Sequence, residues 1–190
     1  MNFNDVVSNV EIYGLENAIR VSKFPMSTDV DKPTSDITKT VRLLAGAEPG
    51  SGHDQFLTGI VVQFDLTFSV KAWTEFQRYH FVDFISSQST MHRIARFDMD
   101  KVYMPYTDSR IIDIIKEKVE AYNSNPTPER YLELLYSNPC GMRLTAGITT
   151  NYRQLKTMYF QRKDHRLPEW KAFCEWCETL PYFKEWFIEE

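Results

Sequence analysis

One alternating segment constrains the fold of this chain more than any other part of its sequence. Between Thr58 and Val70 every second side chain is apolar, and these side chains are Ile60, Val62, Phe64, Leu66 and Phe68. Because successive side chains of a β-strand point to opposite faces of its sheet, the alternation predicts a strand with one buried face. The chain must therefore build a β-sheet and cover it.

Most of the remaining sequence has the spacing of amphipathic helices. Ser35 can N-cap one of them, and a short strand is expected at Val10–Tyr13. The helices that we expect cover residues 15–21, 35–45, 71–84, 108–122, 128–136 and 150–163, and a further helix begins at Pro168. With no repeat, linker or low-complexity tract in 190 residues, the sequence predicts a single α+β domain spanning residues 1–190.

The charge balance limits the ligands. The chain has 22 basic and 26 acidic residues and a net charge of −4, which does not favour binding to a nucleic acid polymer. A mononucleotide needs a few local cations and stays possible. The apolar runs are shorter than the roughly 20 residues that cross a bilayer, and the N-terminal residues lack the pattern of a signal peptide. We therefore expect no membrane segment.

The cysteines suggest a reducing compartment. There are three of them, an odd number that does not favour a disulfide scaffold, so we expect a cytoplasmic protein. Cys174 and Cys177 form a lone C-x-x-C pair, whereas a structural zinc site needs four ligands. We expect both thiols to pack inside an amphipathic helix, and we expect no metal site.

The segment Arg78–Arg93 concentrates groups that bind phosphate. It reads R-Y-H-F-V-D-F-I-S-S-Q-S-T-M-H-R, so cations and imidazoles stand close to a run of hydroxyls. An arginine such as Arg78 can donate two parallel hydrogen bonds to a phosphate. The alternative is a surface helix with a polar C-terminal turn.

A second segment, Asn151–Arg162, suggests recognition of a planar ring. Asn151, Leu155, Met158 and Arg162 fall at i, i+4, i+7 and i+11, which places them on one helical face roughly 16 Å long. An amide and a guanidinium at the two ends of an apolar face can hold a flat heterocycle by its edges. The alternative is an ordinary buried face with polar ends.

With these motifs in order, the chain resembles the flavin-dependent thymidylate synthases. That family has a T-x-N-x-R-x-L motif and an arginine eleven residues after the Asn, which match Thr149–Leu155 and Arg162. The R-H-R that follows the family's alternating strand is similar to Arg78-Tyr79-His80. Further counterparts are Ala18–Ser22 and Gly52–Phe56, and the resemblance spans about residues 10 to 175.

The resemblance implies a fold and a reaction. The fold would be a central, mostly antiparallel sheet flanked by helices, assembled into a homotetramer with shared active sites. The reaction would be that of an FAD-dependent methyltransferase, which uses NADPH and transfers a one-carbon unit from methylenetetrahydrofolate to C5 of dUMP or a related pyrimidine nucleotide. The compact chain and its altered motif would suit a bacteriophage protein in the host cytoplasm.

The resemblance also implies roles for individual residues. Arg162 is the expected catalytic residue, placed against the carbonyl edge of the base. The expected cofactor-binding residues are His53, Arg78, Tyr79, His80, Asn151, Arg153 and Thr157. The expected substrate-binding residues are Glu75, Arg78, Gln88, Ser89, Thr90, His92, Arg93 and Arg162.

Departures from the family pattern leave alternatives open. The R-H-R motif is altered to Arg78-Tyr79-His80, and Gln88 stands where the family has a carboxylate. The chain could instead be a nucleotide-binding homologue that has lost flavin-dependent turnover, or a structural oligomer without a ligand. Uracil and cytosine nucleotides both remain open as substrates.

Overall fold

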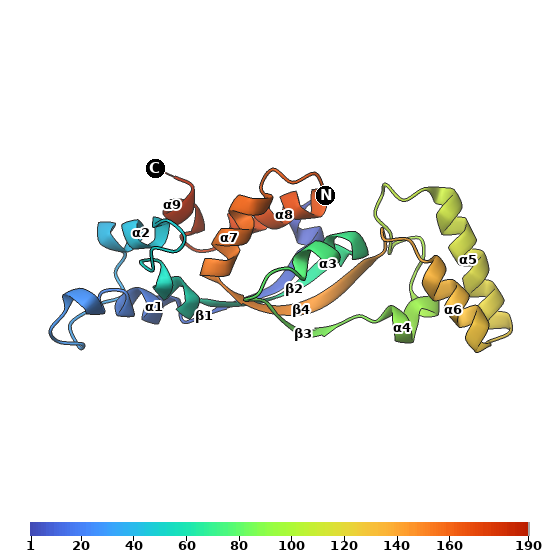
Figure 1. Cartoon of the computed structure of the whole chain (residues 1–190), viewed down its shortest axis with the longest axis horizontal. Coiled ribbons are helices and arrows are strands. Elements are labelled where there is room, and N and C mark those ends of the chain that lie inside the picture. Colours follow the sequence, from blue (N-terminus) through green and yellow to red (C-terminus); the bar gives the residue numbers. More distant parts are fainter. Residues whose placement is uncertain (190) are drawn as a thin grey trace. The chain divides into compact units, whose positions relative to one another are not determined.

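A four-stranded sheet runs through the computed structural model, which describes residues 1–189 (Figure 1). Its strands are β1 (Val7–Tyr13), β2 (Val61–Ser69), β3 (Asp83–Ser87) and β4 (Arg143–Asn151). They lie in the order β1-β2-β4-β3, and β1 pairs antiparallel with β2. The predicted α+β class with a central antiparallel sheet is confirmed.

Helices make up most of the remaining described structure. They are α1 (Leu15–Val21), α2 (Lys39–Gly46), α3 (Val70–Phe76), α4 (Thr90–Arg93), α5 (Ser109–Ser124), α6 (Pro128–Ser137), α7 (Tyr152–Arg162), α8 (Pro168–Cys177) and α9 (Phe183–Phe187). Short 3-10 turns are η1 (Phe3–Asp5), η2 (Phe24–Met26), η3 (Gln55–Gly59) and η4 (Ile94–Arg96). The predicted bounds of α1 match, those of α6 differ by one residue at its C-terminal end, and those of α5 and α7 differ by one or two residues at each end.

The chain divides into two compact units. Unit 1 comprises Met1–Leu66, Tyr79–Ile85 and Gly147–Glu190, and unit 2 comprises Thr67–Arg78 and Ser86–Ala146. Strands β2, β3 and β4 each begin in one unit and end in the other. A single domain spanning residues 1–190 stays a prediction.

In unit 1 the buried face of β2 packs on α8. Burial along β2 alternates as its sequence predicts, and Val62, Phe64 and Leu66 are at most 2% exposed. The ring of Phe64 lies 4.6 Å from that of Trp176 and 6.2 Å from that of Phe173. Burying a side chain of this size stabilises a fold by about 1.5–3 kcal/mol. Figure 1 shows α7 and α8 on the same side of the strands, so α7 is held against a rigid core.

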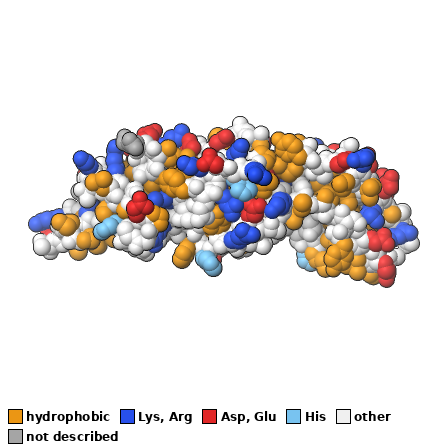
Figure 2. Space-filling view, turned by 45° about the horizontal axis from the view of Figure 1, so that its top comes forward, with side chains coloured by type: hydrophobic (Ala, Val, Ile, Leu, Met, Phe, Trp, Pro, Cys, Tyr) orange, Lys and Arg blue, Asp and Glu red, His pale blue; other side chains and the backbone are white. Residues whose placement is uncertain are grey.

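Unit 2 contains a hairpin formed by α5 and α6. Asp108 and Thr127 N-cap these helices, since each side chain accepts a hydrogen bond from a backbone N–H of the first turn. The core contains Ile94, Met99, Tyr103, Ile115, Leu134 and Met142. The outer face stays exposed, with Tyr136 88% accessible, and Figure 2 shows hydrophobic side chains gathered over this region.

The helix predicted for residues 71–84 is wrong beyond Phe76. α3 ends there, and residues 83–87 form the edge strand β3 instead. Gln88 extends the pairing of this strand, because its N–H donates to Thr145 O and its Oε1 accepts from Thr145 N, both at 2.9 Å. Tertiary pairing therefore overrides the helical spacing that the sequence shows here.

Two further differences from the sequence prediction concern the strand β4 and the start of α2. β4 was not predicted, because its buried positions carry Ala146, Ile148 and Thr150, a set too small and polar to read as an apolar alternation. α2 begins at Lys39 with Thr38 as its N-cap, so the predicted N-cap at Ser35 is wrong. Within residues 1–189, no helix is long and apolar enough to span a membrane.

Candidate functional site

The site begins where β4 turns into α7 in unit 1. Asn151 is the N-cap residue of α7, and its Oδ1 accepts a hydrogen bond from Gln154 N at 2.9 Å. The backbone N–H of Tyr152 donates to Ile60 O at 3.1 Å, which ties the helix start to the residue that precedes β2. An N-cap of this type stabilises a helix by about 1 kcal/mol. The hydrogen bond to Gln154 N therefore fixes the side chain of Asn151 at the start of the helix.

A cavity of about 760 Å³ opens beside the N-terminal half of α7. It is lined by Gly46, Ala47, Glu48, Pro49, Asp54, Gln55, Thr58, Phe81, Asn151, Arg153, Gln154, Lys156, Thr157, Phe160 and Gln161. The aromatic side chains of Phe81 and Phe160 are 71% and 47% exposed. Amides, a guanidinium and accessible rings around one cavity can bind a planar heterocycle that carries hydrogen-bonding edges.

Of the two cations that line this cavity, Arg153 is the accessible one and Lys156 is buried. Its Nε lies 3.0 Å from Oδ1 of the buried Asp54, and its Nη1 donates to Gln55 Oε1 at 2.8 Å. The side chain of Arg153 is 32% exposed, whereas that of Asp54 is 2% exposed. Asp54 Oδ1 has no hydrogen-bond partner among the described residues, so the carboxylate holds the guanidinium as an ion pair, while Gln55 accepts its hydrogen bond.

Lys156 completes a buried charged cluster. Its Nζ donates to Ala45 O at 2.8 Å and to Ala47 O at 2.7 Å, and it lies 3.3 Å from Asp54 Oδ2. Lys156 is 5% exposed. Its contacts join the C-terminal end of α2 to α7, so they shape one wall of the cavity.

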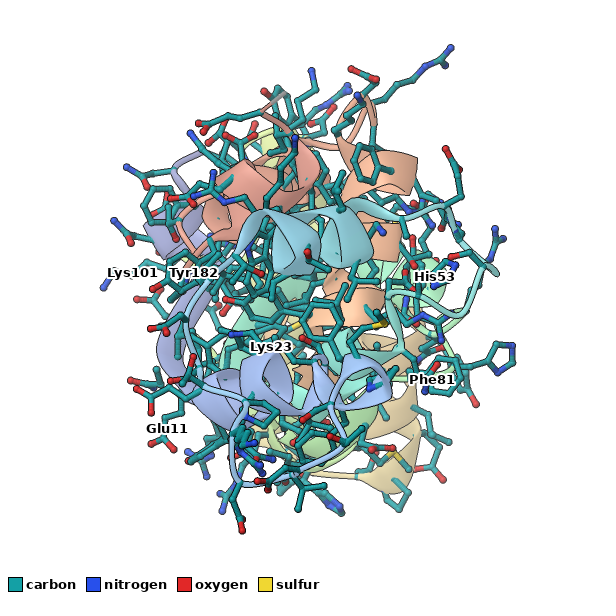
Figure 3. The ribbon with its side chains drawn as sticks, turned by 90° about the vertical axis from the view of Figure 1, so that its left-hand side faces the viewer. Glu11, Lys23, His53, Phe81, Lys101 and Tyr182 are labelled. Carbon is teal, nitrogen blue, oxygen red and sulfur yellow. The ribbon has the colours of Figure 1, made fainter. Side chains whose placement is uncertain are left out.

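Three of the seven predicted cofactor residues line this cavity, whereas His53, Arg78, Tyr79 and His80 do not. Asn151, Arg153 and Thr157 line it together, as the family motif predicts for one site. His53 is exposed next to Asp54, and Figure 3 shows it on the same side as Phe81. His80 is exposed as well. Cofactor binding by His53 and His80 stays a prediction.

Arg162 lies at the opposite end of α7 in a packed environment. Its Nε donates to Tyr79 Oη at 2.8 Å, and its guanidinium carbon lies 4.6 Å from the ring centre of Trp170. The predicted ring-binding face between Asn151 and Arg162 is wrong, because Leu155 and Met158 between them are 0% exposed. These two residues are buried in unit 1, and the cavity is lined by other residues of the helix, including Arg153, Thr157 and Phe160. The catalytic role of Arg162 stays a prediction.

The remaining predicted residues lie in unit 2, and their roles stay predictions. Arg78, His92 and Arg93 are exposed, so their side chains are accessible to a ligand. Glu75 Oε1 pairs with Lys71 Nζ at 2.9 Å. Ser89 and Thr90 are half-buried at the start of α4. Gln88 uses its side-chain oxygen in the pairing with Thr145, which is a structural role that the sequence did not suggest.

The C-x-x-C pair is a packing feature. Cys174 and Cys177 are at most 4% exposed on α8, as the sequence predicts. Burial raises the pKa of the Cys174 thiol to about 12 and raises the pKa of Cys177 well above its ordinary value. Thiols held protonated are poor nucleophiles and poor metal ligands. Among residues 1–189, no group of His, Cys, Asp and Glu side chains is arranged to hold a metal ion.

Sequence reasoning missed Asp54, Gln55 and Lys156. Gln55 and Asp54 stand in a turn whose motif was matched to the family, but the sequence gives no sign that they reach Arg153. Lys156 falls between Leu155 and Met158 on α7, and a lysine among buried positions is the signal that could have indicated a buried ion pair.

Comparisons with known proteins identify the fold. No protein-family model and no curated protein matches the sequence. The structure is similar to the flavin-dependent thymidylate synthase ThyX from Helicobacter pylori, crystallised with FAD and dUMP, with a TM-score of 0.70 and 12% identity over 96% of this chain and 98% of that one. It is also similar to the UMP/dUMP methylase PolB from Streptomyces cacaoi, with a TM-score of 0.61 and 14% identity over 95% and 90% of the two chains. The chain therefore has the fold of the flavin-dependent thymidylate synthases.

Proposed function

We propose that this chain is a flavin-dependent methyltransferase of the thymidylate synthase type. It transfers a one-carbon unit from methylenetetrahydrofolate to C5 of dUMP or a related pyrimidine nucleotide, with NADPH as the reductant. The observation that carries the proposal is the cavity beside α7, which Asn151, Arg153 and Thr157 line together. These residues belong to the segment with the strongest motif resemblance, in a chain with the ThyX fold. Solved structures with this fold hold FAD and dUMP or a uridine nucleotide.

The cavity fits part of a flavin cofactor. Its volume of about 760 Å³ lies within the roughly 300–1,000 Å³ that small-molecule sites occupy. Phe81 and Phe160 offer accessible rings to a planar heterocycle, and Arg153 offers a cation to a phosphate. FAD, when bound, supplies the redox chemistry of the reaction. The protein would bind it and orient it through the residues that line the cavity.

The pyrimidine nucleotide is assigned to a second group of residues. The exposed side chains of Arg78, His92 and Arg93 in unit 2 would bind its phosphate, assisted by hydroxyls at the start of α4. Arg162 would stabilise negative charge on the carbonyl edge of the base. The packing of its guanidinium on Trp170 keeps the planar group in one orientation, which is what a preorganised donor needs. The assembly would be a homotetramer in the cytoplasm, with sites completed by neighbouring subunits.

One observation favours the alternative of a nucleotide-binding homologue without flavin turnover. Tyr79 occupies the middle position of the altered R-H-R motif, and its hydroxyl accepts a hydrogen bond from Arg162. A group that is occupied in this way is less available to a cofactor. The alternative predicts nucleotide binding without bound flavin and without methyl transfer.

Two measurements on the purified protein separate these possibilities. The first is titration with FAD, followed by flavin absorbance near 450 nm and by quenching of flavin fluorescence. The second is mass-spectrometric detection of dTMP formed from dUMP, methylenetetrahydrofolate and NADPH. FAD binding with dTMP formation supports the proposal. Nucleotide binding without either result supports the alternative, and no binding of any nucleotide overturns both.

A further inference from the structure

The guanidinium of Arg153 contacts protein groups through Nε and Nη1 and leaves Nη2 without a protein partner in the described part of the chain. Its Nε lies 3.0 Å from Asp54 Oδ1 and its Nη1 donates to Gln55 Oε1, whereas Nη2 has no hydrogen-bond partner in the described part of the chain. The side chain lines the cavity. The two N–H groups of Nη2 are therefore the part of the guanidinium that remains for a ligand.

The carboxylate that holds Arg153 is itself fixed from the interior. Asp54 is 2% exposed, and its second oxygen lies 3.3 Å from Lys156 Nζ. Lys156 directs its other two donors to Ala45 O and Ala47 O, so its three N–H groups are all used. An unpaired buried carboxylate would be costly, and Lys156 offsets that cost independently of Arg153. Asp54 can thus orient Arg153 without neutralising it.

The cluster of Asp54, Arg153 and Lys156 has a net charge of +1. Asp54 carries one negative charge between the two positive charges of Arg153 and Lys156, and Lys156 is enclosed. Among the described lining residues, the remaining titratable side chain is Glu48, which is exposed at the rim. The accessible cation of the cavity is therefore Arg153, and its contacts with Asp54 and Gln55 hold its guanidinium in one orientation.

We propose that Asp54 and Lys156 are positioning residues that present the Nη2 edge of Arg153 to a phosphate oxygen of the bound cofactor. This inference rests on the proposed function, because it takes the phosphate to belong to FAD. Phosphate is the ligand chemistry that matches a fixed guanidinium edge in a cavity with accessible aromatic rings. Neither Asp54 nor Lys156 needs to touch the cofactor.

A double-mutant cycle on FAD affinity tests the mechanism. Asp54→Asn keeps the shape of the side chain but removes the charge, and we expect FAD to bind roughly 10- to 100-fold more weakly. In an Arg153→Ala background the same substitution should change affinity less than about twofold, because Asp54 acts through Arg153. Gln55 is exposed, so Gln55→Ala should not disturb folding. This substitution should weaken FAD binding less than Asp54→Asn does, and it should have no further effect in the Arg153→Ala background. Asp100→Asn, which removes a carboxylate from an exposed ion pair in unit 2, is the matched control and should leave FAD affinity unchanged.

Additive effects of Asp54→Asn and Arg153→Ala would overturn the proposal, since Asp54 would then act independently of the guanidinium. A measurement without flavin covers the case in which Asp54→Asn does not fold. The Nη–H resonances of Arg153 in the wild-type protein, assigned by their loss in Arg153→Ala, should appear as separate signals, because the ion pair with Asp54 and the hydrogen bond to Gln55 Oε1 hinder rotation of the guanidinium. A single averaged signal would refute the positioning role.

The outcome can be separated from that of the proposed function. If the wild-type protein binds no FAD, the proposed function falls, and inorganic pyrophosphate then serves as the probe. Pyrophosphate that shifts the Arg153 Nε–H resonance in the wild-type protein but not in Asp54→Asn would still support an anion receptor positioned by Asp54. The absence of any pyrophosphate effect in the wild-type protein would overturn the receptor itself.

Discussion

The two ends of α7 carry an arginine each, and their environments differ. At the N-terminal end, Arg153 is held by Asp54 and Gln55 and faces a cavity. At the C-terminal end, Arg162 donates to Tyr79 and lies on the ring of Trp170. The same residue type in one motif therefore has polar contacts beside a cavity at one end and aromatic packing at the other.

This difference indicates that the two arginines have different roles. A guanidinium beside a cavity with part of its edge open is suited to bind a ligand. A guanidinium stacked on aromatic rings contributes to the fold, and it can act on a substrate only in the orientation that the rings impose. Substitutions at the two ends should accordingly separate cofactor affinity from turnover and stability.

The largest effect is expected at Arg162. Arg162→Ala should lower the rate of dTMP formation by roughly 100- to 1,000-fold, the usual loss when one preorganised donor to a developing negative charge is removed. FAD should remain bound. Arg162→Lys should restore little, because an ammonium cannot reproduce a planar fork. The checks are the dTMP assay and the flavin spectrum, and full turnover by Arg162→Ala would remove the catalytic role.

The same substitution should also reduce stability. Arg162 loses its contacts with Trp170 and Tyr79 on truncation, which should cost about 1–2 kcal/mol. Chemical denaturation measures this loss independently of activity. Equal stability of Arg162→Ala and the wild-type protein would contradict the packed environment described for this end of α7.

The second effect is expected at Arg153. Arg153→Ala should weaken FAD binding by roughly 10- to 150-fold, since a hydrogen bond to a charged group contributes about 1.5–3 kcal/mol. Turnover at saturating FAD should fall far less than in Arg162→Ala. Fluorescence titration gives the affinity. A variant that binds FAD as tightly as the wild-type protein would break the comparison between the two ends.

A smaller effect concerns Tyr159, in the C-terminal half of α7. Burial raises the pKa of its phenol, and the hydrogen bond to Glu178 Oε1 at 2.9 Å adds to this. Because the folded pKa lies above the unfolded value of about 10, the contribution to stability is complete below pH 10 and is lost as pH rises further. The free energy of unfolding should therefore fall as pH rises above about 10.

Phe substitutions test the assignment of this pH dependence. Tyr159→Phe should reduce the alkaline loss and cost about 1 kcal/mol at pH 8 through the lost hydrogen bond. Tyr136→Phe, at a side chain that is 88% exposed, is the control and should change neither quantity. FAD affinity at pH 8 should be unaffected by both, and a weakened affinity in Tyr159→Phe would argue against the division of α7 into two ends.

The smallest effect is expected at the thiols. Cys174 and Cys177 are buried with raised pKa values, whereas Cys140 is exposed. At pH 8 the native protein should show one fast-reacting thiol per chain and three after unfolding. Cys140→Ser should remove the fast phase without changing FAD binding. Rapid reaction of all three thiols in the native protein would show that α8 does not enclose the pair.

Periodic segments of the fold were predictable from the sequence. The strand containing Phe64 and Leu66, the helices that became α5 and α6, and α7 have strong patterns or clear caps, and the structure contains them. Residues 77–84 were predicted as part of a helix because Phe76, His80 and Phe84 have helical spacing. Pairing with β4 decided their structure, and β4 itself is short of large apolar residues.

The candidate site was predictable in part. Asn151, Arg153 and Thr157 could be grouped because a family motif joins them, and the cavity brings them together. The ring-binding face was placed on Leu155 and Met158, but spacing along a helix does not reveal which face meets the core. The link from Lys156 through Asp54 to Arg153 joins residues about 100 positions apart and is determined by tertiary packing.

The most direct test of the account is to locate FAD on α7. In an NMR titration of the isotope-labelled protein, FAD should shift the backbone resonances of Gly46, Gln154, Thr157 and Gln161, which line the cavity beside Arg153. Resonances of Trp170 and other residues around Arg162 should move much less. Saturable shifts concentrated around Tyr79 and Trp170, with the cavity residues unchanged, would contradict the claim that the N-terminal end of α7 is the cofactor-binding end.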